Sequence, residues 1–191
     1  MKDIMIATGN KNKTKEYRQI LEPLGYCVHD LSEIEHQEIE ETGSTFQENA
    51  ILKAKAVKTN MMVIADDSGL EIHGLNNEPG IYSARYLQGY DYDYKCHNII
   101  DRLKNIKDRS ARFTCCIALV ENDDVKTFTG TMDGTIAYQM KGNNGFGYDP
   151  IFIAEGNNIT NGELTNQQKN EISHRGKATK LLLAYLGGKN K

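Results

Sequence analysis

Apolar residues recur along this chain in two patterns, one typical of strands and the other typical of amphipathic helices. Short apolar runs bounded by turn residues predict strands at 4–7, 26–29, 61–65, 112–121, 125–131, 135–139 and 151–153. Apolar positions at helical spacing, and a run rich in Ala and Lys, predict helices between residues 10 and 25 and at 49–58, 93–103 and 174–186. This mixture of strands and helices predicts an α/β fold.

Several residues mark where the predicted helices begin and end. Gly25 is expected to end the first helix, and Gly187 with Gly188 is expected to stop the last one. Thr45 and Glu48 have the spacing of a capping box at the start of the second helix. Since no repeat, low-complexity block or linker-like shift in composition interrupts the chain, residues 1–191 are predicted to form a single domain.

The composition is that of a soluble globular protein, with 39% hydrophobic and 26% charged residues. A chain of 191 residues is long enough for one compact domain or for two closely associated lobes. The net charge of −3 argues against a broad basic surface for DNA or RNA, but it leaves room for a local basic pocket that binds a phosphate chain.

The cysteines and the apolar segments indicate where the protein works. None of the four cysteines belongs to a CxxC pair or to a Cys/His cluster with zinc spacing, and they are predicted to be small buried hydrophobes in a reducing compartment: Cys27, Cys96, Cys115 and Cys116. The first apolar run is too short for a signal peptide, and none approaches the roughly 20 residues of a membrane span. A cytoplasmic protein without membrane contact is therefore expected.

A possible phosphate site lies where the first strand turns into the first helix. Backbone N–H groups at a helix start bind anions, and a lysine one turn further adds positive charge. The segment is not a Walker A loop, and an ordinary turn with solvated lysines is the alternative. The six residues are Thr8, Gly9, Asn10, Lys11, Asn12 and Lys13.

Two acidic pairs suggest a cation beside that phosphate site. Glu40-Glu41 lies in an acidic loop, and Asp66-Asp67 follows a predicted buried strand. Adjacent carboxylates repel each other unless a cation or a proton lies between them, and Mg²⁺ prefers oxygen ligands. A solvated acidic loop and a capped turn are the alternatives for the two pairs.

Two further segments could bind a nucleotide base. The glycine-rich segment 142–149 contains aromatic residues that could stack on a base and an acceptor that could bind its edge. A lysine, and a His-Arg pair at the start of the last helix, could meet an anion or base carbonyls. A loop that plugs the core and a plain helix start are the alternatives. The candidate residues are Phe146, Gly147, Tyr148, Asp149, Lys169, Ser173, His174 and Arg175.

Six motifs in order, from Ile4 to about Leu186, resemble the inosine triphosphate pyrophosphatase (Ham1/RdgB-like) family, which acts on noncanonical purine nucleoside triphosphates such as dITP and XTP. They are Thr8-Gly9-Asn10 with Lys13 and Glu16; Glu41-Thr42-Gly43 with Thr45-Phe46 and Glu48-Asn49-Ala50; the segment 65–70 around Asp66-Asp67-Ser68; the segment 79–86 from Pro79 to Tyr86; the segment 145–152 around Phe146-Gly147-Tyr148-Asp149; and the segment 172–178 around Ser173-His174-Arg175. Together they are far more specific than any one alone.

The resemblance implies an ITPase-like fold, with a long mixed β-sheet flanked by helices and two lobes with an active-site cleft between them. It implies a homodimer, a Mg²⁺ cofactor, and hydrolysis of ITP, dITP or XTP to the monophosphate and pyrophosphate. By similarity, Thr8, Asn10 and Lys13 hold the triphosphate, and Glu41 and Asp67 hold the metal with Asp66 nearby. Asp67 is then the catalytic base, Ser68 contacts substrate, and Phe146 stacks on the purine. The base pocket is lined by Asp149, Lys169, Ser173, His174 and Arg175.

Base selectivity follows from hydrogen bonding. Donors such as Lys169 or Arg175 suit the 6-keto oxygen of hypoxanthine, whereas the 6-amino group of adenine would leave a buried donor unpaired. Two other functions remain possible from the sequence. One is a Maf-like pyrophosphatase for pyrimidine nucleoside triphosphates, and the other is a nucleotide-binding module without turnover.

Overall fold

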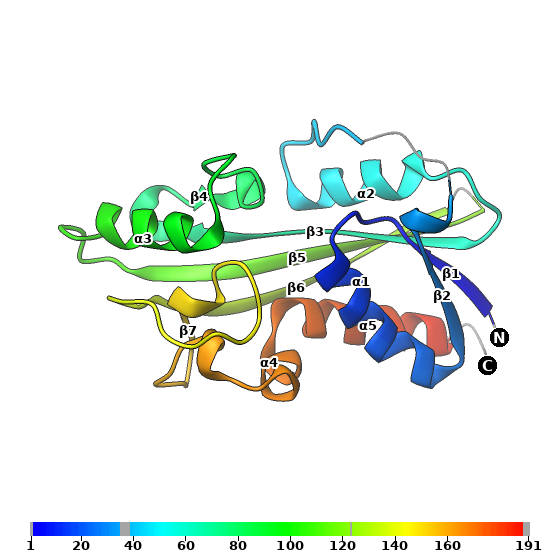
Figure 1. The fold of residues 1–191 in the computed structure, drawn as a ribbon. Helices are drawn as coiled ribbons and strands as arrows, with labels where there is room; N and C mark the ends of the chain where they lie inside the picture. The colour runs from blue at the N-terminus through cyan, green and yellow to red at the C-terminus, as the bar shows by residue number, and fades with distance from the viewer. Residues whose placement is uncertain (1, 35–38, 123, 189–191) are drawn as a thin grey trace. The chain divides into compact units, whose positions relative to one another are not determined.

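The computed structural model describes residues 2–34, 39–122 and 124–188. The described strands form a seven-stranded sheet in the order β2-β1-β3-β5-β6-β7, with β4 paired to β3 (Figure 1). The strands are β1 (Lys2–Ile6), β2 (Tyr26–Asp30), β3 (Met62–Ile72), β4 (Glu78–Pro79), β5 (Ser110–Glu121), β6 (Asp124–Ile136) and β7 (Phe152–Ala154). The α-helices are α1 (Lys11–Leu21), α2 (Phe46–Ala56), α3 (Tyr92–Arg102), α4 (Asn166–Ile172) and α5 (His174–Gly188).

The sheet is mixed, which confirms the predicted fold class. β1 pairs in parallel with β2 and with β3, whereas β4 runs antiparallel to β3 and β7 antiparallel to β6. Parallel strands need crossover connections, and α1 supplies one between β1 and β2. All described helices are too short or too polar to span a membrane.

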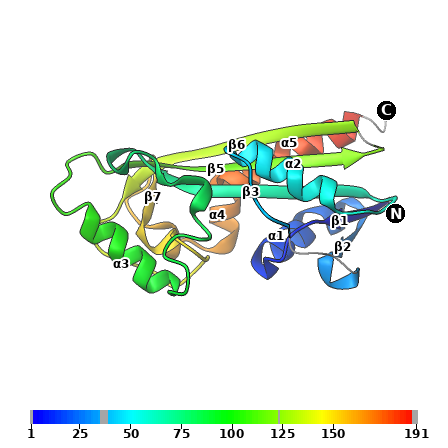
Figure 2. The ribbon, with the colours of Figure 1, turned by 90° about the horizontal axis from the view of Figure 1, so that it is seen from above.

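The chain divides into two compact units. Unit 1 comprises the residues up to Asp67 together with Cys116–Phe128, and unit 2 comprises Ser68–Cys115 and the residues from Thr129 onward. In unit 1, α1 and α2 cover opposite faces of the strands, and the core contains buried residues of β1, α2 and β3 (Figure 1). In unit 2, the core contains residues of α3, β5, β6 and β7, and α4 packs against α5 (Figures 1 and 2).

The described part of each unit has its own apolar core, in keeping with two lobes. The prediction of one two-lobed domain over residues 1–191 stays a prediction.

Strand β4 was not predicted, and two predicted strands extend well beyond their expected ends. β3 continues to Ile72, seven residues beyond the predicted end, because its second half is largely buried and its last two residues pair with β4. Asp66 and Asp67 therefore lie inside a strand and not at its end. The separate strand predicted at 135–139 is wrong, since β6 already extends to Ile136. In both places strand pairing extends a strand through residues that look like turn signals.

Helix ends and burial also depart from prediction in places. Thr45 caps α2 by accepting the Glu48 N–H, whereas the Glu48 carboxylate accepts mainly from the backbone N–H and the hydroxyl of Ser44, which the predicted capping box did not include. α5 includes Gly187 and Gly188, which were expected to stop it. Helix α4 was not predicted. Of the four free cysteines three are buried, and only Cys27 is partly exposed.

Candidate functional site

The start of α1 forms the predicted strand-to-helix turn, but its side chains cap part of it. Asn10 is the N-cap residue, and its side-chain oxygen accepts from the backbone N–H of Asn12 and of Lys13 at 3.0 and 3.4 Å. The Thr8 hydroxyl accepts the Asn10 N–H at 3.2 Å. Gly9, Lys11 and Asn12 are exposed. The turn is thus prefolded, and Asn10 already satisfies two of the N–H groups that an anion would use.

Lys13 joins this turn to the strand that carries the acidic pair. Its ammonium Nζ lies 2.9 Å from a carboxylate oxygen of Asp66, whose side chain is fully buried. A buried carboxylate costs several kcal/mol in lost hydration unless a cation compensates it, and Lys13 supplies that charge here. The lysine predicted for the triphosphate is therefore held beside β3 by an ion pair.

Asp66 and Asp67 do not form the side-by-side pair that their sequence suggested. Successive side chains of a strand point to opposite faces, and the two carboxylates have different lysine partners. Asp66 pairs with Lys13 of α1, whereas Asp67 pairs with Lys53 of α2, the helix that covers the other face (Figure 1). Each carboxylate is therefore paired with a different lysine.

Lys53 is the functional candidate that sequence reasoning missed. Its Nζ lies 2.7 Å from Glu41 and 2.9 Å from Asp67, so one ammonium bridges the two predicted metal ligands. Burial alone lowers the pKa of Lys53, but the charges of Asp67 and Asp66 and the hydrogen bond to Glu41 outweigh it, and the net pKa is raised. Lys53 is therefore charged at neutral pH.

Asn49 fixes the second oxygen of Asp67. Its amide nitrogen donates to that oxygen at 3.2 Å, and its amide oxygen accepts the Gly43 N–H at 2.8 Å. Asn49 and Lys53 are four residues apart and so share one face of α2. That spacing, in a helix preceded by an acidic loop, is the signal from which Lys53 could have been found.

The donor set of unit 1 suits a hard divalent cation. Glu41 and Asp67 offer carboxylate oxygens, the ligands that Mg²⁺ prefers. The Lys53 ammonium lies between them and shows that the two carboxylates accept a shared positive charge. The residues predicted as metal ligands are therefore brought together around one cation position.

In unit 2, Asp149 and Lys169 form a buried ion pair. The Lys169 ammonium lies 2.6 Å from the Asp149 carboxylate, and the two side chains are only 6% and 3% exposed. Asp149 also accepts the Phe146 N–H at 2.8 Å and the Asn161 amide at 3.4 Å. The Asp149 carboxylate therefore links the glycine-rich segment to Asn161 and to Lys169 of α4.

Phe146 presents its ring to two cations. Lys169 Nζ lies 4.6 Å from the ring centroid, and the Arg175 guanidinium carbon lies 5.8 Å from it, both within the range of cation–π attraction. Arg175 also donates to the Ser68 hydroxyl at 3.0 Å. An aromatic face, two cations and a hydroxyl therefore meet in unit 2, as the sequence predicted for a base site.

The glycine-rich segment is a fixed turn. Gly145 has φ +75°, and a Cβ at that position would lie 2.2 Å from the Asp149 carboxylate. Any other residue there would be strained in its backbone and would clash with the acid that anchors Phe146. Gly147 likewise has φ +68°. Glycine at 145 is therefore required by the close approach of Asp149.

Tyr148 and His174 face the core of unit 2. The Tyr148 hydroxyl donates to the Ser83 carbonyl at 2.8 Å, and burial raises the pKa of Tyr148. His174 is 6% exposed and stacks on Phe113 at a centroid distance of 4.8 Å. Ser173 is buried, and its hydroxyl accepts the Gly176 N–H in the first turn of α5. These three side chains support the site, whereas Phe146, Lys169 and Arg175 form its aromatic and cationic surface.

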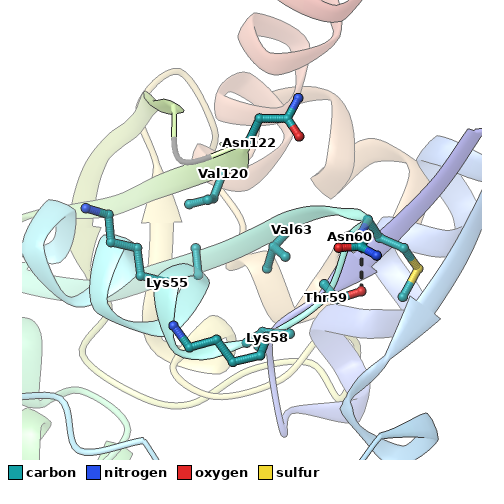
Figure 3. Close-up of a pocket in the computed structure, with 10 residues that line it drawn as sticks. Lys55, Lys58, Thr59, Asn60, Val63, Val120 and Asn122 are labelled. Carbon is teal, nitrogen blue, oxygen red and sulfur yellow. Dashed lines mark hydrogen bonds between the residues drawn. The ribbon is translucent and has the colours of Figure 1, made fainter.

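One of the cavities lies apart from all the predicted site residues. It has a volume of about 840 Å³ and a wall that includes Lys55, Lys58, Val63, Val120 and Asn122, all in unit 1 (Figure 3). A smaller cavity of about 460 Å³ in unit 2 includes Arg109 and Tyr138 in its wall. None of the predicted substrate or metal residues lines either cavity, so neither cavity bears on the predicted substrate and metal sites.

A family model and several named relatives match nearly the whole chain, over the same range as the six motifs. The family model described as the Ham1 family matches residues 4–185. The chain belongs to the Ham1 family. It is 49% identical to the dITP/XTP pyrophosphatase of Bacillus subtilis (strain 168), with 97% of this chain and 98% of that protein covered. It is 46% identical to the dITP/XTP pyrophosphatase of Staphylococcus epidermidis (strain ATCC 12228 / FDA PCI 1200), with 98% of each covered.

Solved Ham1 proteins share the fold over the whole chain. The Staphylococcus aureus Ham1 protein aligns with a TM-score of 0.90 at 44% identity, covering 98% of this chain and all of that one. A HAM1 protein from Coxiella burnetii aligns with a TM-score of 0.91 at 41% identity and the same coverage. The family and the fold predicted from the motifs are thereby confirmed.

Proposed function

We propose that this Ham1-family protein hydrolyses dITP, XTP and ITP to the nucleoside monophosphate and pyrophosphate, with Mg²⁺ as cofactor. The observation that carries the proposal is the position of Lys53, which bridges Glu41 and Asp67, while Asn49 donates to the other oxygen of Asp67. Full-length identity of 46–49% to relatives named dITP/XTP pyrophosphatase supports it. Under this proposal, residues of unit 1 carry out the hydrolysis and residues of unit 2 bind the base.

Asp67 is proposed as the general base. Lys53 and Asn49 each hold one of its oxygens, so the carboxylate is fixed in one orientation and can accept the proton of the attacking water. Glu41 and Asp67 are the residues that would hold Mg²⁺, which when bound supplies charge neutralisation for the phosphate chain. Hydrolysis then breaks the bond between the α and β phosphates.

The basic residues of the α1 turn are proposed to bind the triphosphate. Lys13 balances the charge of Asp66 in the free protein and can shift to a phosphate oxygen when substrate arrives. Thr8, Gly9, Asn10, Lys11 and Asn12 surround the helix start, where the macrodipole favours negative charge. This pairing keeps Lys13 ordered before substrate binds.

The cluster around Phe146 is proposed to bind the purine. The ring of Phe146 would stack on the base, while Lys169 and Arg175 are donors suited to a 6-keto oxygen. Gly147 and Asp149 belong to the turn that fixes Phe146, and Ser68, Tyr148, Ser173 and His174 complete the cluster. A 6-amino group would leave a buried donor unpaired at a cost of about 1–3 kcal/mol, or roughly 5- to 150-fold in selectivity.

We also propose a homodimer in the cytoplasm, on the strength of the family resemblance and the four free cysteines. Light scattering after size-exclusion chromatography tests the dimer: a mass near twice 21.5 kDa supports it. A mass near 21.5 kDa contradicts it.

The reaction is tested with a panel of nucleotides. Purified protein with Mg²⁺ is incubated with ITP, XTP, dITP, ATP, GTP, dTTP and UTP, and both products of each reaction are identified. Pyrophosphate with IMP or XMP, and little turnover of ATP or GTP, is expected. Turnover of dTTP or UTP instead would assign a Maf-like activity, and release of single phosphates would contradict cleavage between the α and β phosphates.

Asp67→Asn tests the base, with Asp101→Asn as a matched control because Asp101 is exposed and forms its ion pair with Lys104, away from the predicted site. Turnover is expected to collapse in the first variant and to persist in the second, while nucleotide binding survives in both. Unchanged turnover in Asp67→Asn would remove the assignment of Asp67 as base.

A further inference from the structure

Strands β1 and β2 carry a group of ligating side chains that the proposed hydrolysis does not use. Cys27 and His29 are two residues apart on β2, so their side chains leave the same face of the strand. Asp3 lies directly opposite Cys27 in the parallel register. One ligand atom from each of the three lies within 4.8 Å of the others. We call Asp3, Cys27 and His29 the β1–β2 cluster.

The sequence predicted no zinc site because it contains no Cys/His motif with the usual spacing. The arrangement of the three ligands explains why their spacing in the sequence gives no metal-site signal. Two of the ligands alternate along one strand, and the third comes from a neighbouring strand 24 positions earlier than Cys27. Strand pairing, and not local spacing, brings them together.

His29 has the hydrogen bonds that orient a metal-binding imidazole. Its Nε2 lies 3.0 Å from Asp3, and its Nδ1 lies 2.7 Å from the carboxylate of Glu33. Metal-bound histidines almost always donate the N–H of the other ring nitrogen to such a group, which fixes the tautomer. With Nδ1–H donated to Glu33, the lone pair of Nε2 lies on the side of Asp3, within the β1–β2 cluster.

Glu33 is itself held in place. Its carboxylate accepts the backbone N–H of Asp30 at 3.2 Å in a capping box, and it lies 3.5 Å from the Arg18 guanidinium. The orientation of His29 is therefore fixed by the fold, which lowers the entropic cost of assembling a ligand set.

We propose that Asp3, Cys27 and His29 bind one zinc ion, through a carboxylate oxygen, the thiolate sulfur and Nε2, with water as the fourth ligand. Sulfur and imidazole ligands select zinc over Mg²⁺, which prefers oxygen alone. The Cys27 thiol loses its proton to solvent as the Zn–S bond forms, and no oxidant or reductant is needed.

In the metal-free protein, the two ring nitrogens of His29 are hydrogen-bonded to carboxylates, one to Asp3 and the other to Glu33. Cys27 is the only one of the four cysteines that is not buried, so its sulfur is accessible to an ion from solvent. A bound ion would join β1 to β2 and stabilise the edge of unit 1.

The test uses the full-length protein, stripped with a chelator and free of Mg²⁺ and nucleotide. Cobalt(II) is titrated first, because a thiolate-to-cobalt charge-transfer band in the near ultraviolet reports sulfur ligation directly. Zinc is then titrated against a competing chelator. One equivalent of each metal is expected, with the band present in the cobalt form.

Three variants and one control locate the site. Cys27→Ser is expected to remove the charge-transfer band, and His29→Gln to weaken zinc binding by at least about 100-fold, while Glu33→Gln weakens it by about 10- to 100-fold. His97→Gln is the control, because His97 is exposed on α3 and its Nδ1 bonds the Asp93 carbonyl of the same helix. It is expected to bind zinc like the unaltered protein.

A measurement without substitutions guards against a folding defect. Zinc is expected to protect Cys27 from alkylation in the unaltered protein, as mapped by mass spectrometry. Absence of the band, a band that persists in Cys27→Ser, or labelling of Cys27 at the same rate with and without zinc would each overturn the proposal. Zinc binding lost only in Asp67→Asn would also overturn it, since the ion would then occupy the catalytic carboxylates. None of these outcomes depends on turnover.

Discussion

The buried ion pair of Asp149 and Lys169 gives a quantitative prediction for the stability of unit 2. The two charged groups are 2.6 Å apart and at most 6% exposed. Replacing Asp149 with Asn leaves a buried ammonium without its carboxylate, and replacing Lys169 with Met leaves a buried carboxylate without its ammonium. Removing one partner of such a pair costs about 3–5 kcal/mol.

The structure also predicts which single variant is worse. In Lys169→Met the Asp149 carboxylate keeps the Phe146 N–H and the Asn161 amide. In Asp149→Asn a single amide oxygen must serve donors that two carboxylate oxygens served before, so one donor is left unpaired at a further cost of about 1–3 kcal/mol. Asp149→Asn is therefore expected to be the less stable of the two variants.

The double variant, compared with the two single variants, isolates the interaction free energy between Asp149 and Lys169. Replacing both partners removes both buried charges, and such replacements are often nearly neutral. The double variant is expected to be more stable than either single variant, with a coupling free energy of at least about 2 kcal/mol in the cycle.

Urea unfolding followed by far-ultraviolet circular dichroism measures the cycle, because the chain has no Trp for fluorescence. The exposed pair of Asp101 and Lys104, with side chains 68% and 75% exposed at 3.3 Å, is the control. Its equivalent cycle is expected to give no more than about 0.5 kcal/mol. Additive effects at Asp149 and Lys169, or single costs below about 1 kcal/mol, would refute the reasoning.

Three further outcomes are expected. Gly142→Ala should lower the free energy of unfolding by about 3 kcal/mol or more, because φ is +77° and the new Cβ would lie 2.0 Å from backbone atoms of Gly162. Gly156→Ala, with φ +82° and no atom within 4 Å of the new Cβ, should cost only about 1–2 kcal/mol. Thermal unfolding compares the two variants, and equal losses of stability would contradict the role of the contact. Thr45→Ala should cost about 1 kcal/mol through loss of the cap of α2, measured in urea, and no loss would show that the cap is not needed. Burial raises the pKa of Cys96 to about 12, so iodoacetamide at about pH 8 should label Cys27 and spare Cys96, as peptide mass spectrometry can show; equal labelling would contradict that burial.

Local sequence determined most of the elements and the order of the site motifs. The turn at Asn10, the cap at Thr45 and the start of α5 at His174 were predictable, because caps and turns depend on residues within a few positions of each other. The same locality made the phosphate turn and the Phe146–Asp149 segment recognisable as motifs.

Tertiary structure decided which of those residues meet. The segment Asp66–Gly69 reads as a turn, but strand pairing keeps it in β3 and turns Asp66 and Asp67 to opposite faces. Lys53 became a candidate only when α2 placed it between Glu41 and Asp67. The spacing of Asn49 and Lys53 places them on one helix face, but strand register and helix placement decide which carboxylates that face meets, because these contacts join residues 12 or more positions apart.

The β1–β2 cluster shows the same division. The sequence supplied the ligand types, but only the parallel register of β1 and β2 set Asp3 opposite Cys27 and beside His29. Propensity and capping act over one turn or one pair of residues, whereas register is fixed by burial of a whole strand face. The sequence alone therefore determined what the elements are, and the packing of those elements decided which charges and ligands share a site.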